Sequence, residues 1–284
     1  MITGRIELED PVESGPMLRH LEAHAIPGSE VHEAGEARHS RVFATPDGPV
    51  AVTVTITDGR IMVEAEGEGE PEQEFVLAAV RQWLDLDADL ASVRAALGGD
   101  PLIGPMIAAR PGLRVVGYPD GFEGAVMTLL GQQVSLAAAR TFGGRLVAAF
   151  GRPGPGGLSL FPEPERLAGV ATEELRAAIG VTGARARTIR LVAGAFEDGL
   201  GLDPAVDRSE ARRRLLAIPG VGPWTVEYLG VRALRDPDAF PGGDLVLRRV
   251  LGGITTREAE SMSETWRPWR AYALFHLWTS GAFV

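Results

Sequence analysis

Hydrophobic and polar positions alternate along the first part of this chain, as is typical of half-buried β-strands. The clearest case is segment 50–57, where β-branched and small residues alternate before Asp58-Gly59 and a second such run. An Asp-Gly pair between two runs of this kind predicts a tight β-hairpin. Strands are predicted at 5–9, 40–44, 50–57 and 61–66, and a helix at 15–24. The pattern therefore predicts a small antiparallel sheet carrying helices, an α+β domain over residues 1–96.

Beyond this domain, apolar residues recur every three or four positions, which is the period of amphipathic helices. The first such run, 74–84, follows an acidic, glycine-rich stretch (66–74) that is typical of a solvated loop. Later helical runs are predicted at 122–150, 172–180, 184–198, 209–217, 224–235, 245–251 and 269–281, with a loop at 151–157. We therefore expect an all-α remainder of two helical subdomains, a central one (121–236) and a terminal one (97–120 together with 237–284).

The composition narrows the chemistry that this chain can perform. It contains no cysteine, and because the printed sequence has no lysine, all 28 residues counted as Lys+Arg are arginine. Disulfides, cysteine-ligated zinc and iron–sulfur clusters are therefore excluded, and no lysine amine can form a Schiff base. The net charge of −10 taken alone counts against a nucleic-acid partner, because phosphate contacts commonly use cationic side chains.

Two features of the sequence bear on location. No uninterrupted apolar run approaches the roughly 18 residues of a membrane-spanning helix. The N-terminal residues also lack the basic and then apolar order of a secretory signal. We therefore expect a cytoplasmic protein that does not bind membranes.

The most informative segment is a predicted helix–turn–helix at 215–229, whose turn is Pro219-Gly220-Val221-Gly222. Pro223 suits the first position of the second helix, where its missing N–H would have no partner in any case. The two glycines expose backbone N–H groups at a helix N-terminus, and such groups bind phosphate without a cationic side chain. An ordinary connection between two helices is the alternative interpretation of this turn alone.

The wider sequence resembles the helix-hairpin-helix DNA glycosylase superfamily, in which this hairpin precedes a Gly/Pro-rich loop and a catalytic aspartate. Here the loop is Phe240-Pro-Gly-Gly and the aspartate is Asp244. Within the superfamily the chain is most similar to the bacterial 3-methyladenine DNA glycosylase II branch. The segments that carry this similarity are 110–114, 122–135 and 266–278, together with the β-rich N-terminal part.

The resemblance implies roles for individual residues. Asp244 would be catalytic, although an aspartate at this position can also be a helix N-cap. Trp224 occupies the position of the nucleophilic lysine in glycosylases that also cleave the strand. The remaining implied residues are an aromatic base pocket (Trp224, Tyr228 and Trp278), an intercalating plug (Gln133), backbone contacts to DNA (Gly220, Gly222 and Thr225), and carbonyls around a monovalent cation in the DNA complex (Leu216, Ile218 and Val221).

Two positions depart from the pattern of the branch. Gln133 stands where a leucine wedge is known, and Gly243 stands where a second acid can precede the catalytic one. Nearby arginines are candidates either for charge on the DNA-binding face or for solvated helix surface: Arg185, Arg187, Arg190 and Arg248.

The chemistry of alkylated purines fits a single carboxylate. Alkylation at N3 or N7 makes the base cationic and a good leaving group, so that the remaining task is to stabilise the oxocarbenium ion and orient water. Aromatic faces hold a cationic base well. The hypothesis is a monomeric, monofunctional glycosylase that hydrolyses alkylated purines from double-stranded DNA and needs no cofactor, with Na⁺ or K⁺ possible at the hairpin. The alternatives are a non-catalytic DNA- or lesion-binding protein and a glycosylase with another lesion range.

Overall fold

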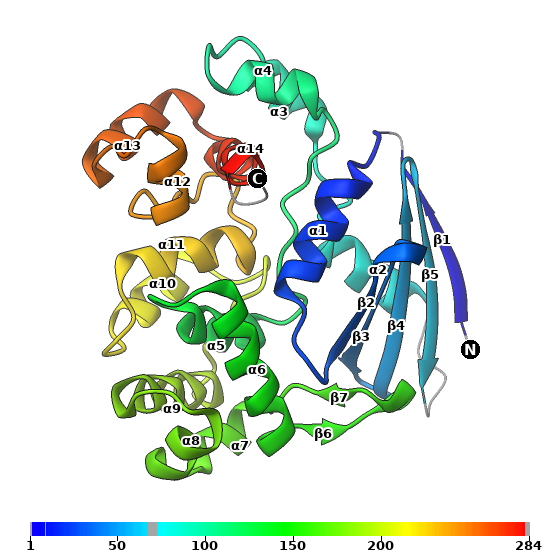
Figure 1. The fold of residues 1–284 in the computed structure, drawn as a ribbon, viewed down its shortest axis with the longest axis vertical. Helices are drawn as coiled ribbons and strands as arrows, with labels where there is room; N and C mark the ends of the chain where they lie inside the picture. The colour runs from blue at the N-terminus through cyan, green and yellow to red at the C-terminus, as the bar shows by residue number, and fades with distance from the viewer. Residues whose placement is uncertain (1, 9, 68–72, 282–284) are drawn as a thin grey trace.

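The N-terminal strands form a five-stranded antiparallel sheet in the order β1-β5-β4-β3-β2 (Figure 1). The computed structural model describes residues 2–8, 10–67 and 73–281. Its strands are β1 (Ile2–Glu7), β2 (Glu30–Glu33), β3 (Arg38–Thr45), β4 (Gly48–Thr57) and β5 (Arg60–Gly67). The predicted hairpin at Asp58-Gly59 is confirmed, because Thr57 pairs with Arg60 and Gly59 adopts a φ of +83°. Strand β2 was not predicted. The predicted loop at 66–74 lies largely outside the described residues.

Most of the helices follow the predicted runs, but those at Leu90–Leu97, Ile103–Ala109, Pro164–Gly169 and Thr256–Ser263 were not predicted. They are α1 (Ser14–His24), α2 (Gln73–Trp83), α3 (Leu90–Leu97), α4 (Ile103–Ala109), α5 (Gly121–Gly131), α6 (Leu136–Phe150), α7 (Pro164–Gly169), α8 (Thr172–Ile179), α9 (Gly183–Glu197), α10 (Arg208–Leu216), α11 (Pro223–Arg232), α12 (Leu245–Val250), α13 (Thr256–Ser263) and α14 (Arg270–Gly281). Short 3-10 turns occur at Ala34–Glu36, Pro155–Gly157 and Glu264–Trp266. The predicted fold class, an α+β domain followed by a helical core, is confirmed.

Two local predictions were wrong. The apolar run 122–150 is not one helix, because the chain breaks between α5 and α6. Gln133 adopts a left-handed φ of +56°, and the Ser135 side chain caps α6 by accepting the amide N–H of Ala138. The predicted loop at 151–157 begins a small hairpin of β6 (Arg152–Pro153) and β7 (Ser159–Leu160).

The buried apolar side chains form two cores. One core joins the sheet and α1 to α4 with the terminal helices α12 to α14, and the other fills the central helices α5 to α11. The sheet domain and the terminal helical part therefore share one apolar interior, although they lie at opposite ends of the sequence. Val231 near the end of α11 belongs to the first core, whereas Val226 and Leu229 of the same helix belong to the second.

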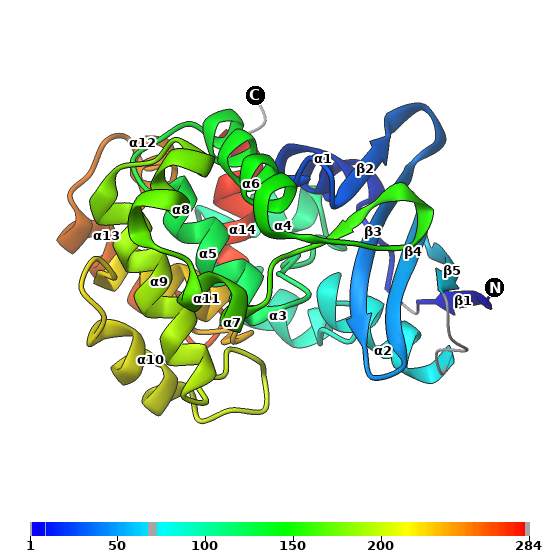
Figure 2. The same cartoon turned by 90° about the horizontal axis from the view of Figure 1, so that it is seen from below.

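Two sets of polar contacts connect the cores. The β6–β7 hairpin extends from the central helices to the sheet (Figure 2), where the Ser29 hydroxyl donates to the Ser159 carbonyl at 2.7 Å. Arg41 on β3 donates to Glu123 on α5 at 2.6 Å and to Glu30 at 2.9 Å. The Arg41 side chain is only 4% exposed and both carboxylates are almost fully buried, so the charges are shielded from water. None of the described helices is both long and apolar enough to cross a membrane.

We predict that Arg41→Met destabilises the protein by about 3 kcal/mol or more, because it leaves two buried carboxylates without their cation. The exposed Arg60 on β5 provides the control, and Arg60→Met should change the free energy of unfolding by less than about 0.5 kcal/mol. Urea unfolding followed by circular dichroism measures both values. Equal effects of the two substitutions would contradict a structural role for the buried ion pairs.

Candidate active site

The Asp244 carboxylate lies where three helices meet. It is the N-cap of α12, and its Oδ1 accepts the amide N–H of Leu247 at 2.9 Å. The indole of Trp278 on α14 donates to the same oxygen at 3.0 Å, and the indole of Trp224 on α11 donates to Oδ2 at 3.2 Å. The residue is 9% exposed. A buried carboxylate is stable only when hydrogen-bonded, and these three N–H donors fix its orientation while Oδ2 keeps acceptor capacity.

The three aromatic residues assigned to the base pocket form one continuous group around this carboxylate. The rings of Trp224 and Tyr228 are stacked with centroids 5.2 Å apart, and those of Tyr228 and Trp278 are 5.7 Å apart. Tyr228 and Trp278 line a cavity of about 260 Å³ that also reaches Asp244, whereas Trp224 does not line it. In this structure Trp224 therefore orients the carboxylate and supports Tyr228, and the other two rings form the cavity wall. Trp266, expected to be structural, is 1% exposed and lies in the core.

One wall of the cavity comes from the sheet domain, and sequence reasoning missed it. Helix α1 lies between the sheet and the helices α6 and α14 (Figure 1), with the His20 ring 5.7 Å from that of Phe275. The cavity is lined from α1 and the residue before it by Glu13, Pro16, Met17, His20, Ala23 and His24. The helix was predicted, but its sequence does not say which of its faces meets the pocket.

A buried arginine, also unpredicted, lines the same cavity. Arg232 is 2% exposed and donates to the Tyr228 hydroxyl at 3.0 Å, and its guanidinium lies 4.8 Å from the centre of the Tyr118 ring. It lies one turn after Tyr228 on α11, so that helical spacing from the predicted aromatic residues was an available signal. Burial, followed by the charge of Arg232, lowers the pKa of His24 to about 3.

The hairpin between α10 and α11 holds both predicted glycines in distinct roles. Gly220 has a φ of +94°, and a Cβ there would lie 2.2 Å from the Thr188 hydroxyl, so only glycine fits. Gly222 is the N-cap of α11 and faces open space. Its position agrees with a backbone surface that a phosphate can approach. The Ile218 carbonyl already accepts the amide N–H of Val221 at 3.0 Å, and Leu216 is half exposed.

Thr225 is buried and serves the turn in this structure. Its hydroxyl accepts a hydrogen bond from the Gln132 side chain at 3.0 Å, and the same amide group donates to the Gly220 carbonyl at 3.2 Å. Gln132 thus links the α5–α6 break to the hairpin, a role that no sequence signal indicated. Its neighbour Gln133, the predicted plug, is exposed beside Val134 and Leu136, two further exposed apolar residues.

Three of the four candidate arginines form hydrogen bonds within the protein. Arg185 donates to the Gln132 carbonyl, Arg190 donates to Thr172 and to the Ala168 carbonyl, and Arg248 donates to the Ile254 carbonyl. Arg187 is exposed on α9. Arg185, Arg190 and Arg248 therefore hold neighbouring segments of the chain in place.

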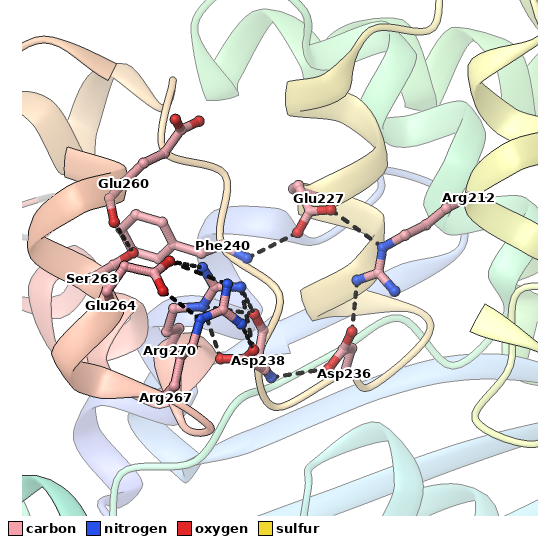
Figure 3. Close-up of polar contacts among 10 residues, drawn as sticks. All are labelled: Arg212, Glu227, Asp236, Asp238, Phe240, Glu260, Ser263, Glu264, Arg267 and Arg270. Carbon is pink, nitrogen blue, oxygen red and sulfur yellow. Dashed lines mark hydrogen bonds and ion pairs between the residues drawn. The ribbon is translucent and has the colours of Figure 1, made fainter. Parts of the chain in front are cut away.

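A network of charged side chains fixes the loop that leads to Asp244 (Figure 3). Glu227 on α11 accepts the Phe240 amide N–H at 3.0 Å with one oxygen and Arg212 at 3.2 Å with the other. Arg212 also donates to Asp236 at 2.7 Å. Further along the loop, Asp238 pairs with arginines from the segment that leads into α14 and from its first turn, Arg267 and Arg270. The loop is thus held at both sides before it reaches the carboxylate.

Two family models match the chain: the AlkA N-terminal domain over residues 3–120, and the HhH-GPD superfamily base excision DNA repair protein over residues 126–271. The chain is 31% identical over 95% of its length to DNA-3-methyladenine glycosylase 2 of Escherichia coli, covering 94% of that protein. The chain belongs to the HhH-GPD superfamily of base excision DNA repair proteins. The resemblance found in the sequence is therefore confirmed.

Another relative is a probable bifunctional transcriptional activator/DNA repair enzyme AlkA of Mycobacterium tuberculosis, 40% identical over 97% of this chain. The chain spans 56% of that relative's length, so the relative contains additional sequence. Among solved structures, a 3-methyladenine DNA glycosylase from Archaeoglobus fulgidus has the same fold, with a TM-score of 0.86 at 24% identity and coverage of 99% of this chain and 98% of that one.

We predict that Glu227→Gln loosens the loop before Asp244 without unfolding the protein. The two donors lie on different oxygens of Glu227, and glutamine replaces one of these oxygens with an NH2 group that cannot accept, so the hydrogen bond to Arg212 or to the Phe240 amide is lost. Amide hydrogen exchange at residues 238–244 should accelerate by about tenfold, which corresponds to the loss of one charged hydrogen bond. The exposed pair Glu210–Arg213 on α10 supplies the control, since Glu210→Gln should leave exchange in this loop unchanged. Unaltered exchange in both variants would show that the loop does not depend on Glu227.

We predict that stability falls below neutral pH through buried histidines. Burial, with a smaller effect from Arg110, lowers the pKa of His276 on α14 to about 4. As the pH falls, the unfolded chain therefore takes up the proton before the folded one does. The contribution of His276 to the free energy of unfolding is fully present above the normal histidine pKa of about 6.5 and is lost as the pH falls toward 4. Between pH 7 and pH 5 the loss attributable to His276 is about 1–2 kcal/mol. In thermal unfolding the decline should be smaller in His276→Leu, and parallel pH curves for the two proteins would refute this assignment.

Proposed function

We propose that this chain is a DNA glycosylase that hydrolyses the N-glycosidic bond of alkylated purines, of the 3-methyladenine and 7-methylguanine type, in double-stranded DNA. One observation carries the proposal: a buried, fully oriented carboxylate, Asp244, faces a cavity walled by aromatic rings and lies next to a hairpin whose backbone can meet DNA. The family of the chain supports the same reaction class. Removal of such a base is the first step of base excision repair.

The reaction requires the damaged nucleotide to leave the duplex, since the scissile bond is inaccessible within the stack. With the base against Tyr228 and Trp278, the sugar would lie toward Asp244, which lines the same cavity. As the bond to the cationic base breaks, positive charge develops at the sugar and the carboxylate stabilises it. Oδ2 has acceptor capacity left beside the Trp224 N–H, and it can orient the water that attacks C1′ and take its proton.

The products are a free base and an abasic site, without strand cleavage by the enzyme. Cleavage by the lyase route needs an amine that attacks the sugar carbon and forms a Schiff base. The sequence contains no lysine, and at the corresponding helix turn the indole of Trp224 is hydrogen-bonded to Asp244. The geometry therefore supports displacement by water alone.

DNA binding is assigned mainly to the hairpin backbone. The N–H groups at Gly220 and Gly222 lie at the exposed start of α11, where the helix dipole also favours a phosphate. We assign the carbonyls of Leu216, Ile218 and Val221 to a monovalent cation, Na⁺ or K⁺, that joins the complex with DNA. Gln133 would fill the gap that the everted nucleotide leaves. We further propose that the protein acts as a cytoplasmic monomer and requires no other cofactor.

A non-catalytic lesion-binding protein is the rival that the Asp244 geometry must exclude, because an aspartate N-cap occurs without catalysis. We predict that Asp244→Asn lowers base release from methylated duplex DNA by at least about a hundredfold, since the charge opposite the oxocarbenium ion is lost. Asparagine is a good N-cap, so α12 should be retained, and circular dichroism should show a folded variant. The thermal midpoint should fall, because the asparagine NH2 group cannot accept the Trp224 N–H as Oδ2 does. DNA treated with the wild-type protein should show strand breaks only after alkali. Base release by neither protein would overturn the proposal, and breaks without alkali would overturn its hydrolytic mechanism.

A further inference from the structure

The histidine at the end of α1 has a defined protonation pattern. His24 lies with its Nδ1 2.8 Å from the carbonyl oxygen of His20, one helical turn earlier. A carbonyl oxygen can only accept, so Nδ1 carries the proton and donates it. In the neutral ring the second nitrogen, Nε2, then holds a free lone pair. The side chain thus presents an acceptor and no second donor.

The surroundings keep the ring in this neutral state. Burial and the nearby guanidinium of Arg232 both disfavour the imidazolium form, so that the pKa of His24 falls to about 3. The ring of His20, stacked on it with centroids 4.1 Å apart, is uncharged for the same reasons, and its pKa also lies well below the usual range. The acceptor at Nε2 is therefore present throughout the physiological pH range.

The lone pair of His24 is free to meet a ligand. Among the described residues Nε2 of His24 has no hydrogen-bond partner, and unlike Nε2 of His20 it is not sealed from solvent by protein atoms. His24 lines the same cavity as Asp244, Tyr228 and Trp278. It is thus a hydrogen-bonding group that the sheet domain contributes to the cavity, whereas the carboxylate comes from the helical part.

The charged residues that line the cavity bear on how a base could be selected. Its lining contains two carboxylates, Glu13 and Asp244, and two guanidinium groups, Arg114 and Arg232. These formal charges cancel, so the cavity as a whole does not select cations by net charge. Selection among bases must then come from stacking and from directed hydrogen bonds.

We propose that Nε2 of His24 accepts a hydrogen bond from an N–H group of the everted base and so acts as a specificity-determining residue. This inference rests on the glycosylase function proposed above. The ligand class is a purine that carries an N–H donor on its exposed edge. Alkylation places positive charge on the ring and makes this N–H a stronger donor, and hydrogen bonds with one charged partner are roughly twice as strong as neutral ones.

The test compares three lesions in the same duplex. 7-Methylguanine is cationic and has N–H donors, hypoxanthine is neutral and has one, and 1,N6-ethenoadenine is neutral with no N–H on its base edge. Single-turnover release rates are measured for the wild type, His24→Leu and His24→Gln, the last of which retains an acceptor. His32→Leu on β2, outside the cavity, is the control. Affinity for duplex DNA with an abasic-site analogue and the thermal midpoint report on folding.

The expected result is selective. His24→Leu should slow release of 7-methylguanine by about tenfold or more and release of hypoxanthine by less, with 1,N6-ethenoadenine unaffected relative to wild type. His24→Gln should recover much of the loss, and His32→Leu should match wild type on all three. Equal losses on the three lesions, or none on any, would overturn the inference while leaving the glycosylase activity of the wild type intact. Absence of release by the wild type would instead overturn the proposed function, and this inference with it.

Discussion

The hydrogen bonding of one buried carboxylate joins three helices beside the cavity. The side chain of Asp244 brings together α11, α12 and α14, because each supplies one of its N–H donors. An unpaired carboxylate at this depth would cost several kcal/mol. The helices must therefore keep their relative positions for the carboxylate to keep all three donors. The same constraint that orients the group for chemistry also contributes to folding, and its cap of α12 and its position at the cavity are two results of one arrangement.

Features encoded over a few neighbouring residues could be predicted from the sequence. The Asp58-Gly59 hairpin, the glycine turn at Gly220 and the aspartate before α12 each depend on local backbone chemistry, and the structure has them where they were expected. Tyr228 and Trp278 were found through a motif resemblance, and both line the cavity.

Features that depend on distant contacts could not be predicted. His24 and Arg232 meet only because α1 lies against the helical part, and no spacing within either segment specifies that meeting. The break between α5 and α6 at Gln-Gln-Val-Ser (132–135) was missed because glutamine is a good helix former, and its residue type does not indicate the left-handed backbone that Gln133 adopts. Strand β2 was missed because its four residues, Glu-Val-His-Glu, are mostly polar at the edge of the sheet. The acidic net charge describes the whole chain and gives no information on the local backbone N–H groups at the start of α11.

The contacts that join the two cores also bear on the shape of the cavity. Helix α1 is rooted in the core of the sheet domain, while most of the apolar side of α11 belongs to the central core. The cavity therefore has lining residues from both cores: α1, α12 and α14 belong to the first core, whereas most of α11 belongs to the second. The Arg41–Glu123 pair and the Ser29–Ser159 hydrogen bond join segments that pack in these two cores, and none of their residues lines the cavity. The shape of the cavity thus depends on the packing between the two cores, and not on its lining residues alone.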